Sequence, residues 1–295
     1  MDVLALLLVL AFYLAFASQG FTERLRRLFP GTPRKLCLAM VLLLPYLMAR
    51  LPAPVTAELV REVAFLALYL LLPVLLLLMR KAPARPLDAL DLVALLLLWL
   101  PFELGWLPAV KVALAPGMKL PLVQFIALGQ ALLLYRIVRP LELGFDFRLS
   151  RADLRLALAA TAAFLALALP LGLWLDFIKV APAPLNAVTL LAVPIGGYFL
   201  VALPEELLFR GIIQNLLERR LGRGLAPLLA TAAIFGLAHL NNFSPHHAPP
   251  NWHYAFMAAL AGIAYGWVWQ RTGKVTAAAI THVLVNWGWL ALFRG

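Results

Sequence analysis

The chain has 295 residues, of which 64% are hydrophobic and 13% are charged, and its mean hydropathy is +0.91. So few polar side chains cannot cover a water-soluble globule, which excludes a soluble enzyme and predicts an integral membrane protein. The net charge of +11 does not indicate nucleic-acid binding, because the basic residues are spread over short polar segments between apolar runs. The expected partner is the lipid bilayer, and no nucleic-acid partner is expected.

The apolar runs, taken in chain order, predict an all-α, polytopic transmembrane helical bundle of about ten spans. A span needs about 20 apolar residues to cross roughly 30 Å of hydrocarbon, and 17 still suffice. The runs lie near residues 2–18, 36–52, 63–79, 90–108, 121–138, 156–178, 187–217, 226–243, 254–270 and 275–293. The first is interpreted as a retained span rather than a secretory signal, because its basic residues follow the apolar run.

Basic residues between these runs predict the orientation. When the loops are assigned alternately to two sides, one side receives 19 of the 25 Lys and Arg residues. The other side receives Arg50, Arg61, Lys111, Lys119, Lys179 and Arg294. Positive charge favours the cytoplasmic side, so the richer side is expected to be cytoplasmic and both termini are expected to face outward.

Two polar stretches, residues 19–35 and 136–155, interrupt the apolar character most clearly. The second predicts a boundary between an N-terminal bundle of unknown function (1–140) and a functional domain (150–295). Cys37 is the only cysteine, which excludes an internal disulfide and a thiolate-rich metal site. We interpret it as a small buried hydrophobic residue.

A pair of carboxylates lies inside the seventh predicted span. Glu206 and Arg210 are four residues apart and therefore neighbours on a helix, whereas Glu205 is rotated from Glu206 by about 100°. Glu206 thus has a counter-ion and Glu205 is free to act as a general base. If a new helix begins near Pro204, its first turn favours both negative charges; the alternative is a kink in a continuous helix.

Three more polar residues lie in later spans: His239, and the pair His282 and Asn286 four residues apart. At 1.5 Å per residue, Glu205 lies ~21 Å from Arg219 along its helix, and Asn286 lies ~18 Å from Lys274. His239 lies at a similar depth, so three helices are expected to bring polar groups to one level. Ionisable groups inside hydrocarbon are costly unless partnered, and therefore indicate a functional site.

Together these residues are the parts of a water-mediated peptide hydrolysis: a carboxylate base, a histidine that polarises water, and donors to an oxyanion. Each signal alone is compatible with helix packing. Two other classes of function stay open. One is a transporter that uses the polar groups as a proton pathway, although no internal repeat is visible; the other is a non-catalytic scaffold in which they hold helices together.

Three motifs on successive predicted spans carry a family resemblance. They are Glu205-Glu206-x-x-x-Arg210, Phe235-x-x-x-His239 and His282-x-x-x-Asn286. In this order they resemble the type II CAAX prenyl endopeptidase family, also called the CPBP or ABI family of intramembrane proteases. The resemblance extends over about residues 156–289.

The resemblance implies an active, all-helical membrane protease whose site opens toward the cytoplasm. It assigns water activation to Glu205 with His239, and an oxyanion hole to His282 and Asn286. The supporting residues would be Glu206 and Arg210, which brace the site, and Phe235, which lines the cavity.

The resemblance favours metal-free chemistry without a cofactor, and the sequence lacks a His-Glu-x-x-His zinc motif. A zinc-dependent alternative would use Glu205, His239 and His282 as ligands. The expected substrate is a membrane-embedded or lipid-associated peptide or a C-terminal anchor segment, in a bacterial inner membrane as the Ala/Leu/Arg/Pro bias indicates. His246, His247 and His253 lie in a Pro- and Asn-rich segment, where solvated side chains are expected and a role is not assigned.

Overall fold

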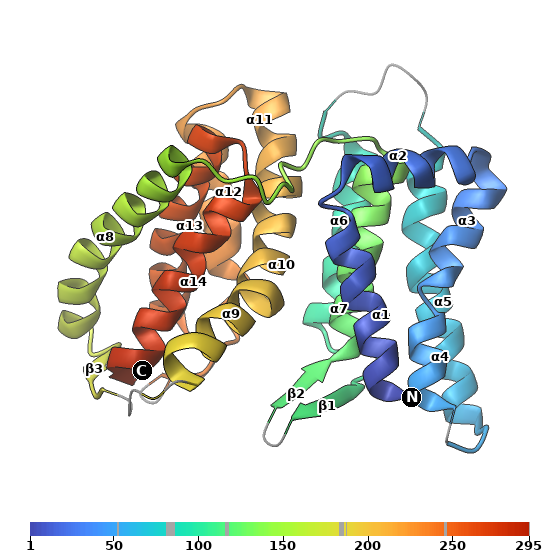
Figure 1. The fold of residues 1–295 in the computed structure, drawn as a ribbon, viewed down its shortest axis with the longest axis horizontal. Coiled ribbons are helices and arrows are strands. Elements are labelled where there is room, and N and C mark those ends of the chain that lie inside the picture. Colours follow the sequence, from blue (N-terminus) through green and yellow to red (C-terminus); the bar gives the residue numbers. More distant parts are fainter. Residues whose placement is uncertain are drawn as a thin grey trace. The chain divides into compact units, whose positions relative to one another are not determined.

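The computed structural model describes residues 1–294 apart from 52, 81–85, 116–117, 183–185, 187 and 245–246. Helices make up most of it, so the predicted all-α class is confirmed, and the strands form only short two-stranded sheets. Contacts within the chain divide it into two units, Met1–Glu142 and Leu143–Gly295. Figure 1 shows the helices of each unit.

The first unit is a helical bundle with one β-hairpin. Its elements are α1 (Asp2–Ala15), α2 (Gln19–Leu28), α3 (Gly31–Val41), α4 (Leu44–Arg50), α5 (Ala57–Leu78), α6 (Ala89–Glu103), β1 (Lys111–Ala115), β2 (Met118–Pro121), α7 (Leu122–Leu132) and η1 (Leu133–Val138). Asp91 is fully buried and ion-paired with Arg80 and Arg139, as a buried charge requires. The expectation of a buried Cys37 is wrong: it lies on the outward face of α3, just before buried Leu38, and is exposed.

The second unit contains the candidate site. Its elements are α8 (Arg151–Trp174), β3 (Lys179–Val180), η2 (Val188–Ala192), α9 (Val193–Gly197), η3 (Tyr198–Ala202), α10 (Leu203–Glu206), η4 (Leu207–Gln214), α11 (Asn215–Leu221), α12 (Leu225–Leu237), α13 (Trp252–Thr272), α14 (Val275–Leu292) and β4 (Phe293–Arg294). Ser150 and Asp153 form a capping box that starts α8. Gly273, at φ 66°, ends α13 in the left-handed conformation, which lets α14 return antiparallel to it.

Each predicted span overlaps with helix in the described part of the chain, but several run past the helix ends, and the number of spans is not confirmed. Within the described residues, five helical segments are long and apolar enough to cross a membrane, or six if a bent pair is counted as one span. The five are Gly31–Arg50, Ala57–Leu78, Arg151–Trp174, Leu190–Leu221 and Val275–Leu292. These segments make the chain an integral membrane protein.

The helix that carries the two carboxylates runs without a break through Pro204. Ala202 and Leu203 have right-handed helical dihedral angles, and residues Leu190–Leu221 form one long segment. The chain therefore forms the alternative, a continuous helix, and no new helix begins near Pro204. The π-helical turns η3 and η4 on either side of α10 adjust the backbone, which is how membrane helices accommodate proline.

Gly236 permits the close packing of α12 on α13. A Cβ at this position would overlap the Ala255 carbonyl oxygen and lie 2.8 Å from the Ala259 Cβ, both on α13. We expect Gly236→Ala to lower the free energy of unfolding by about 1–3 kcal/mol, the usual cost of overpacking. Gly288→Ala is the matched control, because no described atom lies within 4 Å of a Cβ there. Thermal unfolding in detergent should separate the two variants, and equal midpoints would contradict this packing account.

Candidate active site

Glu206 is the buried centre of a three-residue network. Its Oε1 accepts a hydrogen bond from Arg210 Nη1 at 2.9 Å and lies 2.8 Å from His282 Nδ1. Glu206 and Arg210 are fully buried, and the His282 side chain is 4% exposed. The four-residue spacing supplies the first bond, whereas the second joins residues 76 positions apart and depends on packing of α14 against α10.

Arg210 lies in an aromatic cage that holds its charge in place. Its Cζ lies 4.6 Å from the ring centroid of Phe235 and 5.3 Å from that of Tyr265, and Nη2 donates to the Gly262 carbonyl at 3.0 Å. Cation–π contacts and a buried ion pair together compensate for removing the guanidinium from water. Arg210 therefore fixes Glu206, and through Glu206 it fixes His282.

Glu205 points away from this network toward both imidazoles. Its Oε2 lies 3.9 Å from His239 Nε2 and 3.9 Å from His282 Nε2. That oxygen is buried and has no hydrogen-bond partner among the described residues, although the whole side chain is 32% exposed. These separations are too long for direct hydrogen bonds and suit a bridging water.

The contacts of the two Nδ1 atoms determine the protonation of the two Nε2 atoms, which face Glu205. His239 Nδ1 lies 2.7 Å from the Phe235 carbonyl oxygen, and His282 Nδ1 lies 2.8 Å from the Glu206 carboxylate. A carbonyl or carboxylate oxygen can only accept, so both Nδ1 atoms carry a proton. In a neutral ring, Nε2 then presents a lone pair to Glu205, and it can donate only when the ring is protonated at both nitrogens.

Two tyrosines of α13 support the two histidines, a feature that the sequence interpretation did not include. The Tyr254 ring stacks on His239 at 5.6 Å between centroids, and the Tyr265 ring stacks on His282 at 4.5 Å, each with an interplanar angle of 13°. The Tyr254 hydroxyl is also hydrogen-bonded to Asn242. The tyrosines are eleven residues apart, which is about three helical turns and places them on one face of α13. This spacing is the feature of the sequence that could have indicated them.

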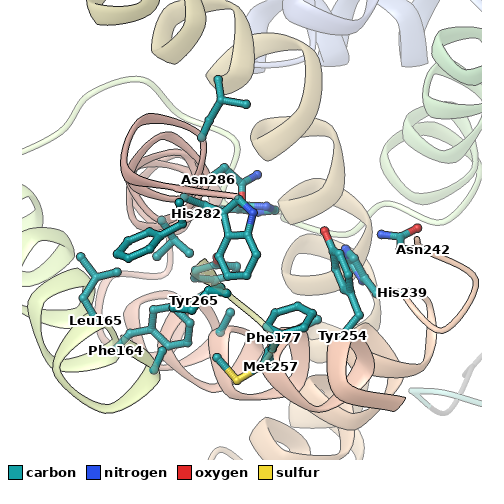
Figure 2. Close-up of a pocket in the computed structure, with 18 of the residues that line it drawn as sticks. Phe164, Leu165, Phe177, His239, Asn242, Tyr254, Met257, Tyr265, His282 and Asn286 are labelled. Atoms are coloured by element: carbon teal, nitrogen blue, oxygen red, sulfur yellow. The ribbon is translucent and has the colours of Figure 1, made fainter. Parts of the chain in front are cut away.

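These side chains line one cavity of about 380 Å³. Figure 2 shows His239, His282 and Asn286 at its wall together with apolar side chains. Asn286 lies one turn beyond His282, and its exposed side chain forms no hydrogen bond with a described residue. Phe235 packs edge-on against His282, with the ring centroids 5.8 Å apart. All four predicted catalytic residues thus line the same cavity, as does Phe235, whereas Glu206 and Arg210 lie behind it.

The three candidate zinc ligands do not form a ready metal site. Among the described residues, no three His, Cys, Asp or Glu side chains are grouped closely enough to hold a metal ion. Glu205 Oε2 lies 3.9 Å from each of the two Nε2 atoms, which is longer than the separation of neighbouring ligand atoms around zinc, so binding a metal would require these side chains to move closer together.

Of the remaining histidines, His247 and His253 have ring centroids 4.0 Å apart. His246 lies outside the described residues. Neither His247 nor His253 lines the described cavity.

Comparison with known proteins bears on the part of the chain that carries the site. Residues 186–288 match the family model described as Type II CAAX prenyl endopeptidase Rce1-like. This confirms the resemblance seen in the three motifs, all of which lie within the matched range. The match supports an intramembrane protease of the CAAX type and thus an enzyme that acts on a membrane-associated substrate. Neither a curated protein nor a solved structure gives a match.

Proposed function

We propose that the chain is a glutamate-type intramembrane endopeptidase that hydrolyses a peptide bond in a membrane-associated peptide or C-terminal anchor segment. The observation that carries this proposal is the convergence of Glu205 Oε2 and two imidazole Nε2 atoms, at 3.9 Å each, on the wall of one cavity. A buried carboxylate oxygen that faces a cavity and has no hydrogen-bond partner among the described residues suits the binding of a water molecule.

In the proposed reaction, a water molecule lies between Glu205 Oε2 and His239 Nε2. Glu205 removes one proton while the water oxygen attacks the scissile carbonyl carbon, which gives a tetrahedral oxyanion. Asn286 and His282 donate hydrogen bonds to that oxyanion. Glu205 then passes its proton to the nitrogen of the leaving amine, the C–N bond breaks, and a carboxylic acid and an amine result.

The oxyanion role requires His282 to be protonated at both nitrogens, because Nδ1 is already engaged by Glu206. The surroundings suit this state. With His282 protonated, the two cations His282 and Arg210 balance the two carboxylates Glu205 and Glu206, so the site is neutral overall. Glu206 would thus position His282 as a positively charged hydrogen-bond donor to the oxyanion, in addition to bracing Arg210.

Residue composition supports a bacterial inner membrane as the location, as the sequence indicates. The experiment that tests the function compares membranes from cells that express the wild-type chain or Glu205→Gln, with new peptide termini mapped by mass spectrometry. We expect some new peptide termini to be present in the wild-type membranes and absent from the Glu205→Gln membranes. Identical termini in both membranes would contradict the protease and favour the scaffold.

Metal removal tests the chemistry separately. We expect cleavage by the purified protein to persist after incubation with a strong zinc chelator, because the proposed water is activated by Glu205 and His239. The measurement is the initial cleavage rate with and without chelator, with a known zinc protease treated in parallel. A loss of rate that added zinc restores would support the metal-dependent alternative.

A further inference from the structure

His239 lies two residues beyond the end of α12, whereas His282 lies within α14. After Leu237, the last residue of the helix, the main chain continues in turns, and His239 N donates to the Gly236 carbonyl at 3.0 Å. Turns closed by bonds to the third residue back have poorer hydrogen-bond geometry than an α-helix. The backbone alone therefore positions His239 less firmly than it positions His282.

The two imidazoles also differ in what holds Nδ1. For His282 the partner is the Glu206 carboxylate, which Arg210 fixes in turn. For His239 the partner is the carbonyl oxygen of Phe235, at 2.7 Å. A hydrogen bond to an ionised group is roughly twice as strong as one between neutral groups. His239 thus has the weaker contact at Nδ1 and depends more on the packing around its ring.

The ring of Tyr254 provides such packing. It lies parallel to the His239 ring, with 5.6 Å between the centroids and 13° between the planes. This separation is within the range of roughly 4.5–7 Å that favours paired aromatic rings. Phe177 meets the Tyr254 ring edge-on, at 5.6 Å and 85°. In Figure 2, Tyr254 lies beside His239 and Asn242 at the wall of the cavity.

Tyr254 is itself fixed by Asn251, the residue before α13, which is 1% exposed. Asn251 Oδ1 accepts a hydrogen bond from Tyr254 N at 3.0 Å, and Asn251 Nδ2 donates to the Asn242 carbonyl at 3.2 Å. Asn242 is hydrogen-bonded through its side chain to the Tyr254 hydroxyl, and its backbone N donates to the His239 carbonyl at 3.0 Å. These bonds tie the start of α13 to the turn that carries His239.

We propose that Tyr254 is a positioning residue for the proposed reaction. Its ring keeps His239 Nε2 at 3.9 Å from Glu205 Oε2, a separation that suits a bridging water. Asn242 and Asn251 keep the ring itself in place. This inference rests on the proposed function and adds a support for the water-activating pair. In it, Tyr254 transfers no proton.

Two substitutions separate the ring from the hydroxyl, with cleavage of a synthetic peptide that spans a mapped site as the assay. Tyr254→Leu removes the planar ring and should lower kcat by about 10²-fold, the effect of displacing a reacting group by about 1 Å, with KM little changed. Tyr254→Phe keeps the ring and should lower kcat by at most about fivefold, the effect of losing one neutral hydrogen bond.

Tyr69→Leu is the matched control, because Tyr69 is a buried tyrosine in the first unit, and it should leave kcat unchanged. A rise in KM without a fall in kcat would show that Tyr254 only lines the cavity, and would overturn the proposal. A Tyr254→Phe variant as slow as Tyr254→Leu would also overturn it, because the hydroxyl rather than the ring would then be the active part.

A measurement without catalysis tests the position of His239 directly. In protein labelled with ¹⁵N-histidine at about pH 8.5, where an ordinary imidazole is neutral, the His239 resonances should show one tautomer with its proton on Nδ1. Their absence from His239→Gln identifies them. Tyr254→Leu should give a mixture of tautomers, because the freed ring loses its bond to the Phe235 carbonyl, and Tyr254→Phe should keep the single tautomer.

A single Nδ1 tautomer in Tyr254→Leu would overturn the proposal. If that variant does not fold, Tyr254→Met replaces it, since Met fills irregular apolar space without a planar ring. The spectrum needs no substrate, so the two proposals fail separately. Peptide termini that do not depend on Glu205 would contradict the protease, whereas an unchanged spectrum would contradict the positioning of His239 by Tyr254.

Discussion

Glu205→Gln is expected to lower kcat by about 10²- to 10⁴-fold, the usual contribution of a general base. The amide keeps the size of the side chain and loses the ability to take a proton from water. Because Glu205 has no ion pair with Arg210 and its Oε2 has no described hydrogen-bond partner, the thermal stability should change little. The measurement is the cleavage rate of the purified variant in proteoliposomes, together with its unfolding midpoint.

Glu23→Gln is the matched control for this result, because the Glu23 side chain is 57% exposed on α2 in the first unit. It should cleave at the wild-type rate. If the Glu205→Gln variant retains full activity, the carboxylate takes no part in the mechanism. If the variant fails to fold, Glu205 has a structural role.

Arg210→Met is expected to destabilise the second unit by about 3–5 kcal/mol, because it leaves the Glu206 carboxylate buried without its cation. The aromatic cage also loses its cation–π partner. His282 should lose its fixed position, since the Glu206 oxygen that holds it is the one bound by Arg210. The measurement is the free energy of unfolding in detergent.

Arg223→Met serves as the control. Arg223 is 62% exposed, and its ion pair with Glu218, at 3.6 Å, is a surface pair that contributes little to stability. The double variant Glu206→Gln, Arg210→Met removes both charges of the buried pair. Its cost should be smaller than the sum of the two single costs, since each single variant leaves one charge unpaired. Additive costs would show that Glu206 and Arg210 do not act as a pair.

The sequence predicts local relations well where helical periodicity determines them. The four-residue spacing places Glu206 beside Arg210 and directs Glu205 elsewhere, and both features are present. The same rule could not predict that His282 Nδ1 reaches Glu206, because that contact depends on how α14 packs on α10.

Two features could not be decided from the sequence, for physical reasons. Pro204 was compatible with a new helix because proline removes a backbone donor, but π-helical turns absorb that loss within a continuous helix. The count of about ten spans stays a prediction, because apolar runs do not show helix length: Leu122–Val138 and Leu225–Leu237 are apolar helices shorter than 18 residues. The tyrosines of α13 were overlooked because aromatic residues are common on membrane helices, and their spacing alone does not identify stacking partners.

The most direct test of the central claim is the incorporation of oxygen from labelled water into the cleaved product. Wild-type protein in H₂¹⁸O, with chelator present, should place one ¹⁸O atom in the new carboxyl group, and Glu205→Gln should form no labelled product at a comparable rate. Labelled product formed equally fast by both proteins would contradict the claim that Glu205, with His239, activates the attacking water.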